Sequence, residues 1–143
     1  MIAIDTNLLV YAHRQDSPFH ERAAEQIRAL AESPSHWAIP WPCVHEFYSI
    51  VTHRRVYSPP STIQQAIDQI EAWLASPSLV LLSESDMHWT VLRALLVDGQ
   101  AIGPMVHDAR IAALCVGHGV RELWSADRDF GRFPRLRTSN PLI

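Results

Sequence analysis

The sequence contains no lysine, and all twelve of its cationic side chains are arginines. This absence excludes a P-loop, which grips phosphates with a lysine, as well as a Schiff-base enzyme and a Ser–Lys hydrolase. Cysteine is also scarce. Cys43 and Cys115 are too few for a disulfide framework, and two thiols alone cannot form a zinc site. The eight histidines show neither an H-E-x-x-H motif nor the spacing of a Cys/His zinc site.

Long apolar runs are missing as well. No window of about 18 apolar residues exists, so the sequence predicts no membrane-spanning helix. The first seven residues, Met1–Asn7, include an acid and lack a basic segment, which argues against a signal peptide. With so few cysteines, the expected location is the reducing cytoplasm.

Length and composition are those of an ordinary globular protein. The chain has 143 residues, of which 48% are hydrophobic and 19% charged, and this predicts a single domain over residues 1–143 with its own core. Fifteen acidic residues against twelve arginines give a net charge of −3. The surface as a whole is therefore not a basic nucleic-acid binder, although a local basic patch remains compatible with this charge.

Short apolar runs alternate with longer segments of helical periodicity. The predicted strands are Met1–Ile4, Trp37–Ile39, Leu79–Leu82, Leu123–Ala126 and a short Leu136–Thr138. Strands separated by helices require crossover connections, which favour a mostly parallel sheet with helices on both faces. We therefore expect an α/β fold, a three-layer α/β/α sandwich with four or five strands, whose strand order the pattern does not reveal.

Helix boundaries follow from capping and turn residues. Helices are predicted over Thr6–His13 and Val106–Val116, and after Pro42. Ser17 followed by Pro18 is typical of a helix start. Ser85 is expected to cap a helix that turns Trp89 toward the core and ends at Gly99, while Ile63 to Leu74 carry an apolar stripe.

Acidic residues follow two of the predicted strands. Asp5 ends the first, and Asp127 ends the fourth. Parallel strands place both at one edge of the sheet, where ligands bind in open α/β folds. Glu46 and Asp108 lie near the starts of two helices that can present them at the same edge, and Asp129 follows Asp127 by two residues.

A cluster of carboxylates is tolerable when a cation neutralises it. Mg²⁺ and Mn²⁺ prefer oxygen ligands, and such an ion can polarise a phosphodiester and activate water without a lysine, cysteine or serine nucleophile. Each acid alone also has an ordinary interpretation: Asp5 as a helix cap, Asp108 as a favourable helix-dipole charge, Asp127 and Asp129 as turn residues. Cys43 beside His45 or His107 offers a thiol nucleophile as a weaker alternative to a buried side chain.

These acids stand in motifs that resemble those of the PIN-domain ribonucleases, in particular VapC-type toxins of bacterial toxin–antitoxin modules. The resemblance covers nearly the whole chain. Its motifs are Ile4-Asp5-Thr6-Asn7, His45-Glu46-Phe47, His107-Asp108-Ala109-Arg110, Trp124-Ser125-Ala126-Asp127-Arg128-Asp129-Phe130 and Asn140-Pro141-Leu142.

The resemblance implies parallel strands between helices, dependence on Mg²⁺ or Mn²⁺, and endonucleolytic cleavage of RNA. It also implies a cognate VapB-type antitoxin and a homodimer. It assigns catalysis and metal ligation to Asp5, Glu46, Asp108 and Asp127. Supporting positions are Thr6, Asn7, Ser125 and Asp129.

Arginines cluster just after the fourth acid. Arg128, Arg132, Arg135 and Arg137 are candidates for binding RNA phosphates, since bidentate arginine contacts suit phosphate; a solvated surface is the ordinary alternative. Arg14, Arg54 and Arg55 are weaker candidates. Without the four proposed ligands, eleven acids face twelve arginines, so the rest of the chain is not repulsive to RNA.

Two other functions remain open. A phosphatase with an aspartyl nucleophile also begins with an acid after its first strand, but that chemistry wants a second acid where Asn7 stands and a downstream lysine. A non-catalytic domain that binds RNA or a partner is the other alternative, although the full set of acids argues against it.

Overall fold

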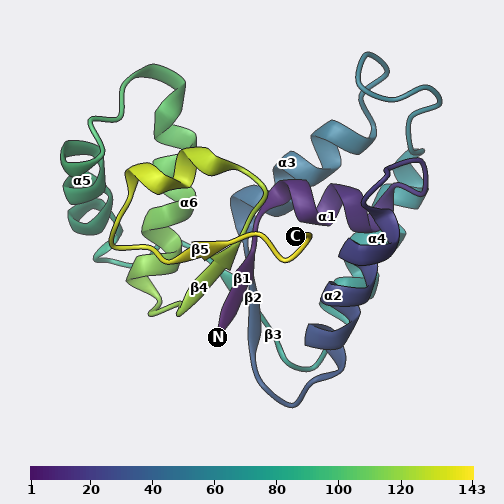
Figure 1. The fold of residues 1–143 in the computed structure, drawn as a ribbon, viewed down its shortest axis with the longest axis horizontal. Coiled ribbons are helices and arrows are strands. Elements are labelled where there is room, and N and C mark those ends of the chain that lie inside the picture. Colours follow the sequence, from purple (N-terminus) through teal and green to yellow (C-terminus); the bar gives the residue numbers. More distant parts are fainter.

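The computed structural model describes all residues, 1–143. Helices and strands alternate along the chain, with two short 3-10 turns, η1 and η2 (Figure 1). In chain order the elements are β1 (Ile2–Ile4), α1 (Thr6–His13), α2 (His20–Glu32), β2 (Trp37–Pro40), α3 (Trp41–Val51), α4 (Ile63–Leu74), β3 (Leu79–Leu82), α5 (His88–Asp98), η1 (Gly103–Met105), α6 (Val106–Gly117), β4 (Glu122–Trp124), η2 (Arg128–Arg132) and β5 (Thr138–Ser139).

The five strands form one sheet in the order β3-β2-β1-β4-β5, and every pair is parallel. This confirms the predicted α/β class. The fourth strand is shorter than predicted and ends at Trp124. The fifth lies at Thr138–Ser139 instead of Leu136–Thr138, and Leu136 is instead a buried residue of the core just before it.

The strand order places helices on both faces of the sheet. From β1 through β2 to β3 the chain moves in one direction, and from β3 it returns past both strands to β4. Because crossovers between parallel strands are right-handed, this reversal puts α5 and α6 on the opposite face from the earlier helices. Figure 1 shows α5 and α6 on one side of the strands and α1, α2 and α4 on the other.

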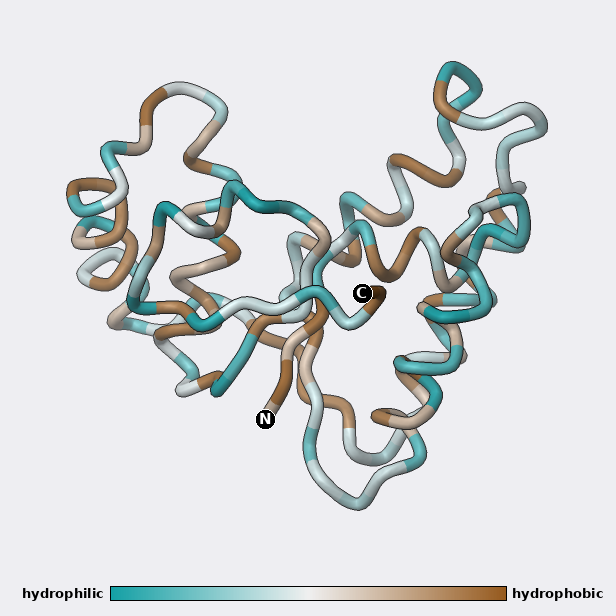
Figure 2. Tube along the Cα trace, in the orientation of Figure 1, coloured by the Kyte–Doolittle hydropathy of each residue, from teal (hydrophilic) through white to brown (hydrophobic).

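Burial follows from this layering. The four residues of β2 are all buried, because its neighbours and both helical layers cover it. Three of the four residues of β3 are half-buried, as expected for an edge strand. In Figure 2 the outer helices α2 and α4 carry long hydrophilic stretches, whereas the central strands are hydrophobic.

Several local predictions are wrong in detail. The second helix begins at His20; Ser17 instead accepts a hydrogen bond from the Phe19 amide in the preceding turn. Ser85 does not cap α5, which follows Met87 without a side-chain cap. Trp89 is 63% exposed because it lies on the outward side of α5. Ile63 and Leu74, at the two ends of the α4 stripe, are exposed as well.

No helix is both long enough and apolar enough to cross a lipid bilayer.

Candidate functional site

The reversal in strand order falls between β1 and β4, and two predicted site residues lie there. Asp5 follows β1 and Ser125 follows β4, and these strands pair directly. The Asp5 amide donates to the Trp124 carbonyl at 3.0 Å, which extends the pairing by one residue. A crevice at such a switch point is where parallel α/β sheets bind ligands.

Asp5 is buried among hydrogen-bond donors. Its side chain is only 5% exposed. Oδ2 accepts a 2.7 Å hydrogen bond from the Ser125 hydroxyl, and Oδ1 accepts a 3.7 Å one from the Cys43 thiol. Asp5 holds the capping position of α1, yet its side chain makes no capping bond to that helix. The carboxylate therefore points toward the switch point, and the capping interpretation fails.

Burial is also the main reason that the pKa of Asp5 is raised to about 6. The nearby charges of Glu46 and Asp108 raise this pKa further, while the hydrogen bond from Ser125 opposes the rise. Asp5 is therefore a carboxylate whose ionised form is unfavourable in its present surroundings, and a bound cation would relieve this cost.

Glu46 reaches the same site from α3. Its Oε2 accepts a 2.7 Å hydrogen bond from the Thr6 hydroxyl at the start of α1. Thr6 is buried, so its hydroxyl is a fixed donor that orients the half-buried Glu46 side chain. This contact is compatible with the supporting role expected for Thr6, which stays a prediction.

Asp108, Asp127 and Asp129 form the other side of the site. One carboxylate oxygen from each lies within 4.8 Å of the other two. Asp127 follows β4, and its Oδ1 accepts a 2.8 Å hydrogen bond from the Asp129 amide. The Ser125 hydroxyl oxygen in turn accepts from the Asp127 amide at 2.9 Å. Asp129, predicted only as a supporting residue, is therefore a full member of this cluster.

The charges in this cluster act on one another. Burial raises the pKa of Asp108, and the charges of Asp127, Asp129 and Glu46 raise it further. The four ion pairs of the molecule include none of the five site carboxylates. Five carboxylates on four separate segments thus lie at one edge of the sheet without an arginine partner. The compact group is Asp108, Asp127 and Asp129; Asp5 and Glu46 lie outside it and act on it through their charges. This arrangement suits a divalent cation with oxygen ligands.

The remaining candidates have structural roles. The side-chain oxygen Oδ1 of Asn7 accepts a 3.3 Å hydrogen bond from the Ala126 amide, which ties α1 to the segment after β4. Cys43 is fully buried, and burial, followed by the charge of Asp5, raises the pKa of its thiol well above the usual value. A thiol held in its protonated form is a poor nucleophile, so the cysteine alternative loses its support. His45 and His107 are exposed.

The four arginines predicted to bind RNA divide into two pairs. Arg128 and Arg132 begin and end η2, next to the acids, and neither forms an ion pair. Arg135 pairs with Asp98 at 3.1 Å, and Arg137 with Glu122 at 3.4 Å. The second pair is thus already partnered by carboxylates outside the site.

A groove of about 670 Å³ lies elsewhere on the surface. Its lining includes His13, Arg14, Ser61 and Gln69 but none of the five site carboxylates. The chemistry therefore belongs to an open sheet edge and not to a closed pocket.

Sequence reasoning missed one contact and gave another residue too small a part. The bond from Cys43 to Asp5 has no sequence signal, because it depends on α3 packing against the end of β1. Membership of Asp129 in the cluster did have one: the Asp-x-Asp spacing after the fourth strand lets the first acid accept from the backbone of the second.

Comparison with known proteins places the chain in a family. The PIN domain matches residues 2–136. Among similar proteins, a VapC ribonuclease of Mycobacterium bovis is 37% identical over 142 residues, covering 99% of this chain and 96% of the relative. Ribonuclease VapC48 of Mycobacterium tuberculosis is 30% identical over 137 residues, covering 96% and 94%.

Solved structures share the fold. VapBC2 from Rickettsia felis, bound to a promoter DNA fragment, superposes with a TM-score of 0.72 at 21% identity, covering 98% of each chain. VapC20 of Mycobacterium tuberculosis gives a TM-score of 0.64 at 14% identity, covering 92% of this chain and 93% of that one. With the family match, the curated relatives and the sheet-edge acids in agreement, this chain belongs to the PIN-domain family, alongside the VapC ribonucleases.

Proposed function

We propose that this protein is a divalent-metal-dependent endoribonuclease that acts as the toxin of a type II toxin–antitoxin pair. Residues 1–143 would work as one PIN-like nuclease domain, which is supported by the family match over residues 2–136. Relatives that are 30–37% identical over nearly their full length bear the name VapC ribonuclease. The RNA substrate is proposed from these names together with the chemistry of the acids.

One observation carries the proposal: carboxylate oxygens of Asp108, Asp127 and Asp129 lie within 4.8 Å of one another at the edge of the sheet. Asp5 and Glu46 lie close enough for their charges to act on this site, and none of the five has an arginine partner. Without a cation, their mutual repulsion would be a pure cost to the fold. A cation that is required for activity explains why these unpaired carboxylates lie so close together. The absence of lysine and of a reactive thiol leaves metal-assisted hydrolysis as the chemistry that suits these residues.

Asp108, Asp127 and Asp129 would hold the ion from one side, with Asp5 and Glu46 on the other. Mg²⁺ or Mn²⁺ suits this set because all the donors are carboxylate oxygens. When bound, such an ion polarises the phosphodiester, activates a water molecule and stabilises the leaving oxygen.

The supporting residues would act by holding these acids in place. Ser125 links Asp5 to Asp127, because its hydroxyl donates to the first side chain and accepts from the backbone of the second. Thr6 fixes Glu46. Such partners preserve the geometry of a metal site and raise its affinity. Arg128 and Arg132, which lie beside the acids without ion pairs, would bind phosphates on either side of the bond that is cut.

Two partners follow from the same assignment. Fold neighbours from Rickettsia felis and Salmonella typhimurium were solved as VapBC assemblies with DNA, which supports a cognate VapB-type antitoxin for this chain. A homodimer is expected as well. Exposed apolar side chains of α5, such as Trp89 and Val97, are available for such an interface.

The test is cleavage of single-stranded RNA by the purified protein with and without Mg²⁺ or Mn²⁺. We expect internal cleavage with either ion, none in EDTA, and a loss of at least about 100-fold in Asp108→Asn. Asp68→Asn is the matched control, since Asp68 is an exposed carboxylate on α4. An Asp108→Asn protein that folds normally and cuts as fast as the wild type would refute the proposal.

The same assay separates the alternatives. A phosphatase would release phosphate from a small phosphomonoester and leave RNA intact. A non-catalytic domain would bind RNA without cutting it in any metal. The phosphatase alternative gains no support, because Asn7 is engaged with the backbone of Ala126. The clustered carboxylates of Asp108, Asp127 and Asp129 argue against a non-catalytic domain.

A further inference from the structure

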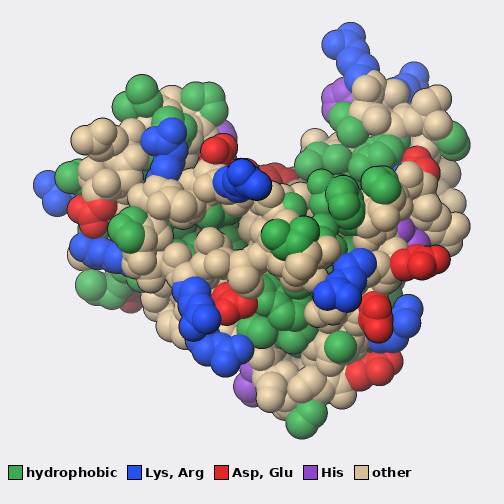
Figure 3. Space-filling model, viewed as in Figure 1, with side chains coloured by type: hydrophobic (Ala, Val, Ile, Leu, Met, Phe, Trp, Pro, Cys, Tyr) green, Lys and Arg blue, Asp and Glu red, His purple; other side chains and the backbone are tan.

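The connector between α3 and α4, residues 52–61, rises away from the body of the molecule as an arm (Figure 1). In the space-filling view of Figure 3, basic side chains stand at the tip of this arm, which forms one side of a hollow. Acidic side chains lie on the floor of that hollow, and further basic side chains lie beyond them. The arm is thus a raised, positively charged wall next to the proposed site.

Arg54 and Arg55 are the arginines of the arm, and both are exposed. Neither forms an ion pair, whereas Arg110, Arg135 and Arg137 pair with nearby carboxylates. The acidic residues of the chain outnumber its arginines, so two adjacent arginines without a carboxylate partner on a projecting turn form a local surplus of positive charge. Such a surplus attracts a polyanion more strongly than the net charge of −3 suggests.

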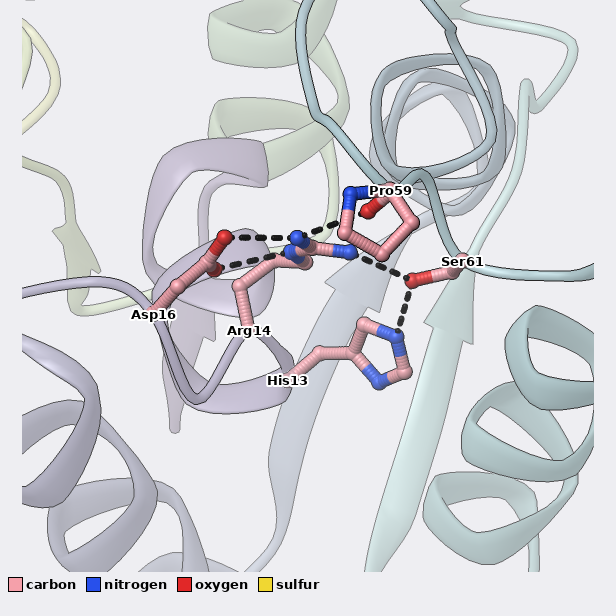
Figure 4. A network of polar contacts seen from close by, with 5 residues as sticks. All are labelled: His13, Arg14, Asp16, Pro59 and Ser61. Carbon is pink, nitrogen blue, oxygen red and sulfur yellow. Dashed lines mark hydrogen bonds and ion pairs between the residues drawn. The ribbon is translucent and has the colours of Figure 1, made fainter.

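The base of the arm is fastened to the end of α1 (Figure 4). Arg14 donates to the Pro59 carbonyl at 3.0 Å and to the Ser61 hydroxyl at 3.3 Å. Asp16 holds the same guanidinium through two hydrogen bonds of 2.9 and 2.6 Å. His13 also contacts the Ser61 hydroxyl, at 2.9 Å.

Two further contacts complete this fastening. The Arg14 guanidinium lies 4.2 Å from the centre of the Tyr57 ring, and the Ser61 amide donates to the Val51 carbonyl at 2.7 Å, which closes the loop at its base. The cation of this network is therefore fully used by protein groups. Its task is to hold the arm, and the charges that remain available are those at the tip.

The arm also has a fixed position relative to the proposed site, because α3 carries Glu46 and leads directly into the arm. Glu46 is in the middle of this helix, and Val51 ends it directly before the arm. Five residues of helix span about 8 Å, so the base of the arm begins about that far along α3 from Glu46. An RNA that crosses the acids would meet Arg128 and Arg132 at η2 and then the arm.

We propose that Arg54 and Arg55 form a second phosphate-binding site, which holds the RNA backbone away from the bond that is cut. This inference rests on the proposed function, since it concerns the same substrate. Contacts to phosphate give affinity without sequence readout. The contacts of Arg14 with Pro59 and Ser61 hold the backbone of the arm, so binding costs little additional ordering of the backbone.

The test compares Arg54→Ala/Arg55→Ala with Arg28→Ala/Arg121→Ala. The control pair removes two exposed arginines, one in α2 and one directly before β4, so the net charge is equal in both variants. Binding of a labelled single-stranded RNA is measured by fluorescence anisotropy in the Asp108→Asn background, where cutting is blocked. Cleavage is then measured in the otherwise wild-type protein.

We expect the arm variant to bind RNA about 3- to 30-fold more weakly at 150 mM salt, as for two exposed charge contacts. The slope of log affinity against log salt should become shallower by about 1.4, since each single-strand phosphate contact contributes about 0.7. In cleavage, KM should rise while kcat stays within about twofold, because the arm is remote from the reacting bond. The control pair should leave both quantities unchanged.

Other results would overturn the inference. If both variants bind RNA with the same affinity and salt slope, the arm does not bind RNA. The proposed function would still stand in that case, provided that the wild type cuts RNA. If the arm variant instead loses affinity for the antitoxin while RNA binding is unchanged, the arginines serve a protein partner. If the Asp108→Asn protein binds no RNA at all, this inference fails, and so does the proposal that RNA is the substrate. A wild-type protein that does not cut RNA would confirm the second failure independently.

Discussion

Asp5→Asn should stabilise the metal-free protein at neutral pH, although it removes a proposed metal ligand. The pKa of Asp5 is raised from 3.8 to about 6 in the folded protein, chiefly by burial. An acid with a raised pKa binds its proton more tightly when folded, so stability is lost as pH rises from about 4 to about 6. A shift of about 2 units corresponds to roughly 3 kcal/mol at pH 7.5.

Asparagine keeps the shape of the side chain and an oxygen that can accept from Ser125. In EDTA at pH 7.5 we therefore expect the melting temperature of Asp5→Asn to exceed that of the wild type by up to roughly 9 °C. The difference should shrink as the pH falls from about 6 to about 4, because Asp5 in the folded wild type takes up its proton near pH 6. Thermal unfolding followed by circular dichroism across pH 4.5–8 measures both effects.

Mn²⁺ should reverse the order of the two proteins. An ion at 1,000 times its dissociation constant stabilises the folded state by about 4.1 kcal/mol. This exceeds the roughly 3 kcal/mol that Asp5→Asn gains at pH 7.5, and only the wild type retains the full ligand set. Asp68→Asn, on the exposed side of α4, serves as the control and should melt like the wild type at every pH. If Asp5→Asn is less stable than the wild type in EDTA by the same amount at pH 4.5 and 8, the argument from buried charge is wrong.

Two further predictions concern neighbouring side chains. Thr6→Val removes the 2.7 Å hydrogen bond to Glu46, so the Mn²⁺ concentration needed for half-maximal cleavage should rise about 10-fold; Thr6→Ser should restore it, and failure to do so would assign the effect to packing. Gly99→Ala places a Cβ 2.7 Å from the buried ring of Phe133. It should lower the free energy of unfolding, measured by chemical denaturation, by about 1–3 kcal/mol. Gly117→Ala is the control and should not destabilise the fold, because its Cβ meets nothing within 4 Å.

The sequence predicted the fold class and the acids that follow the strands because the end of each strand has a clear local signal. An apolar run that stops at an acid, as at Asp5, combines hydrophobic burial with a turn signal, and both are local. Strand order was not predictable, since pairing of β1 with β4 joins residues about 120 positions apart. Helix starts at Ser17 and Ser85 were misplaced because backbone turns at those positions delay the helices to His20 and His88.

The charged surface was harder to predict than the site. Arg135 and Arg137 were grouped with Arg128 and Arg132 because they are close in sequence, but their pairing with Asp98 and Glu122 depends on tertiary structure. Arg54 and Arg55 were weaker candidates because they are far from the fourth acid in the sequence. Nothing in the sequence shows that the arm stands beside the hollow.

The central position of the first strand has a consequence for synthesis. Residues 2–4 leave the ribosome first, yet one of their two neighbouring strands is made of residues 122–124. Asp5 gains the hydroxyl of Ser125 only when the chain is almost complete. A truncated product that ends before β4 therefore lacks the strand that pairs with β1 and two of the five acids. The proposed site of such a protein is incomplete until translation of its messenger RNA is nearly finished.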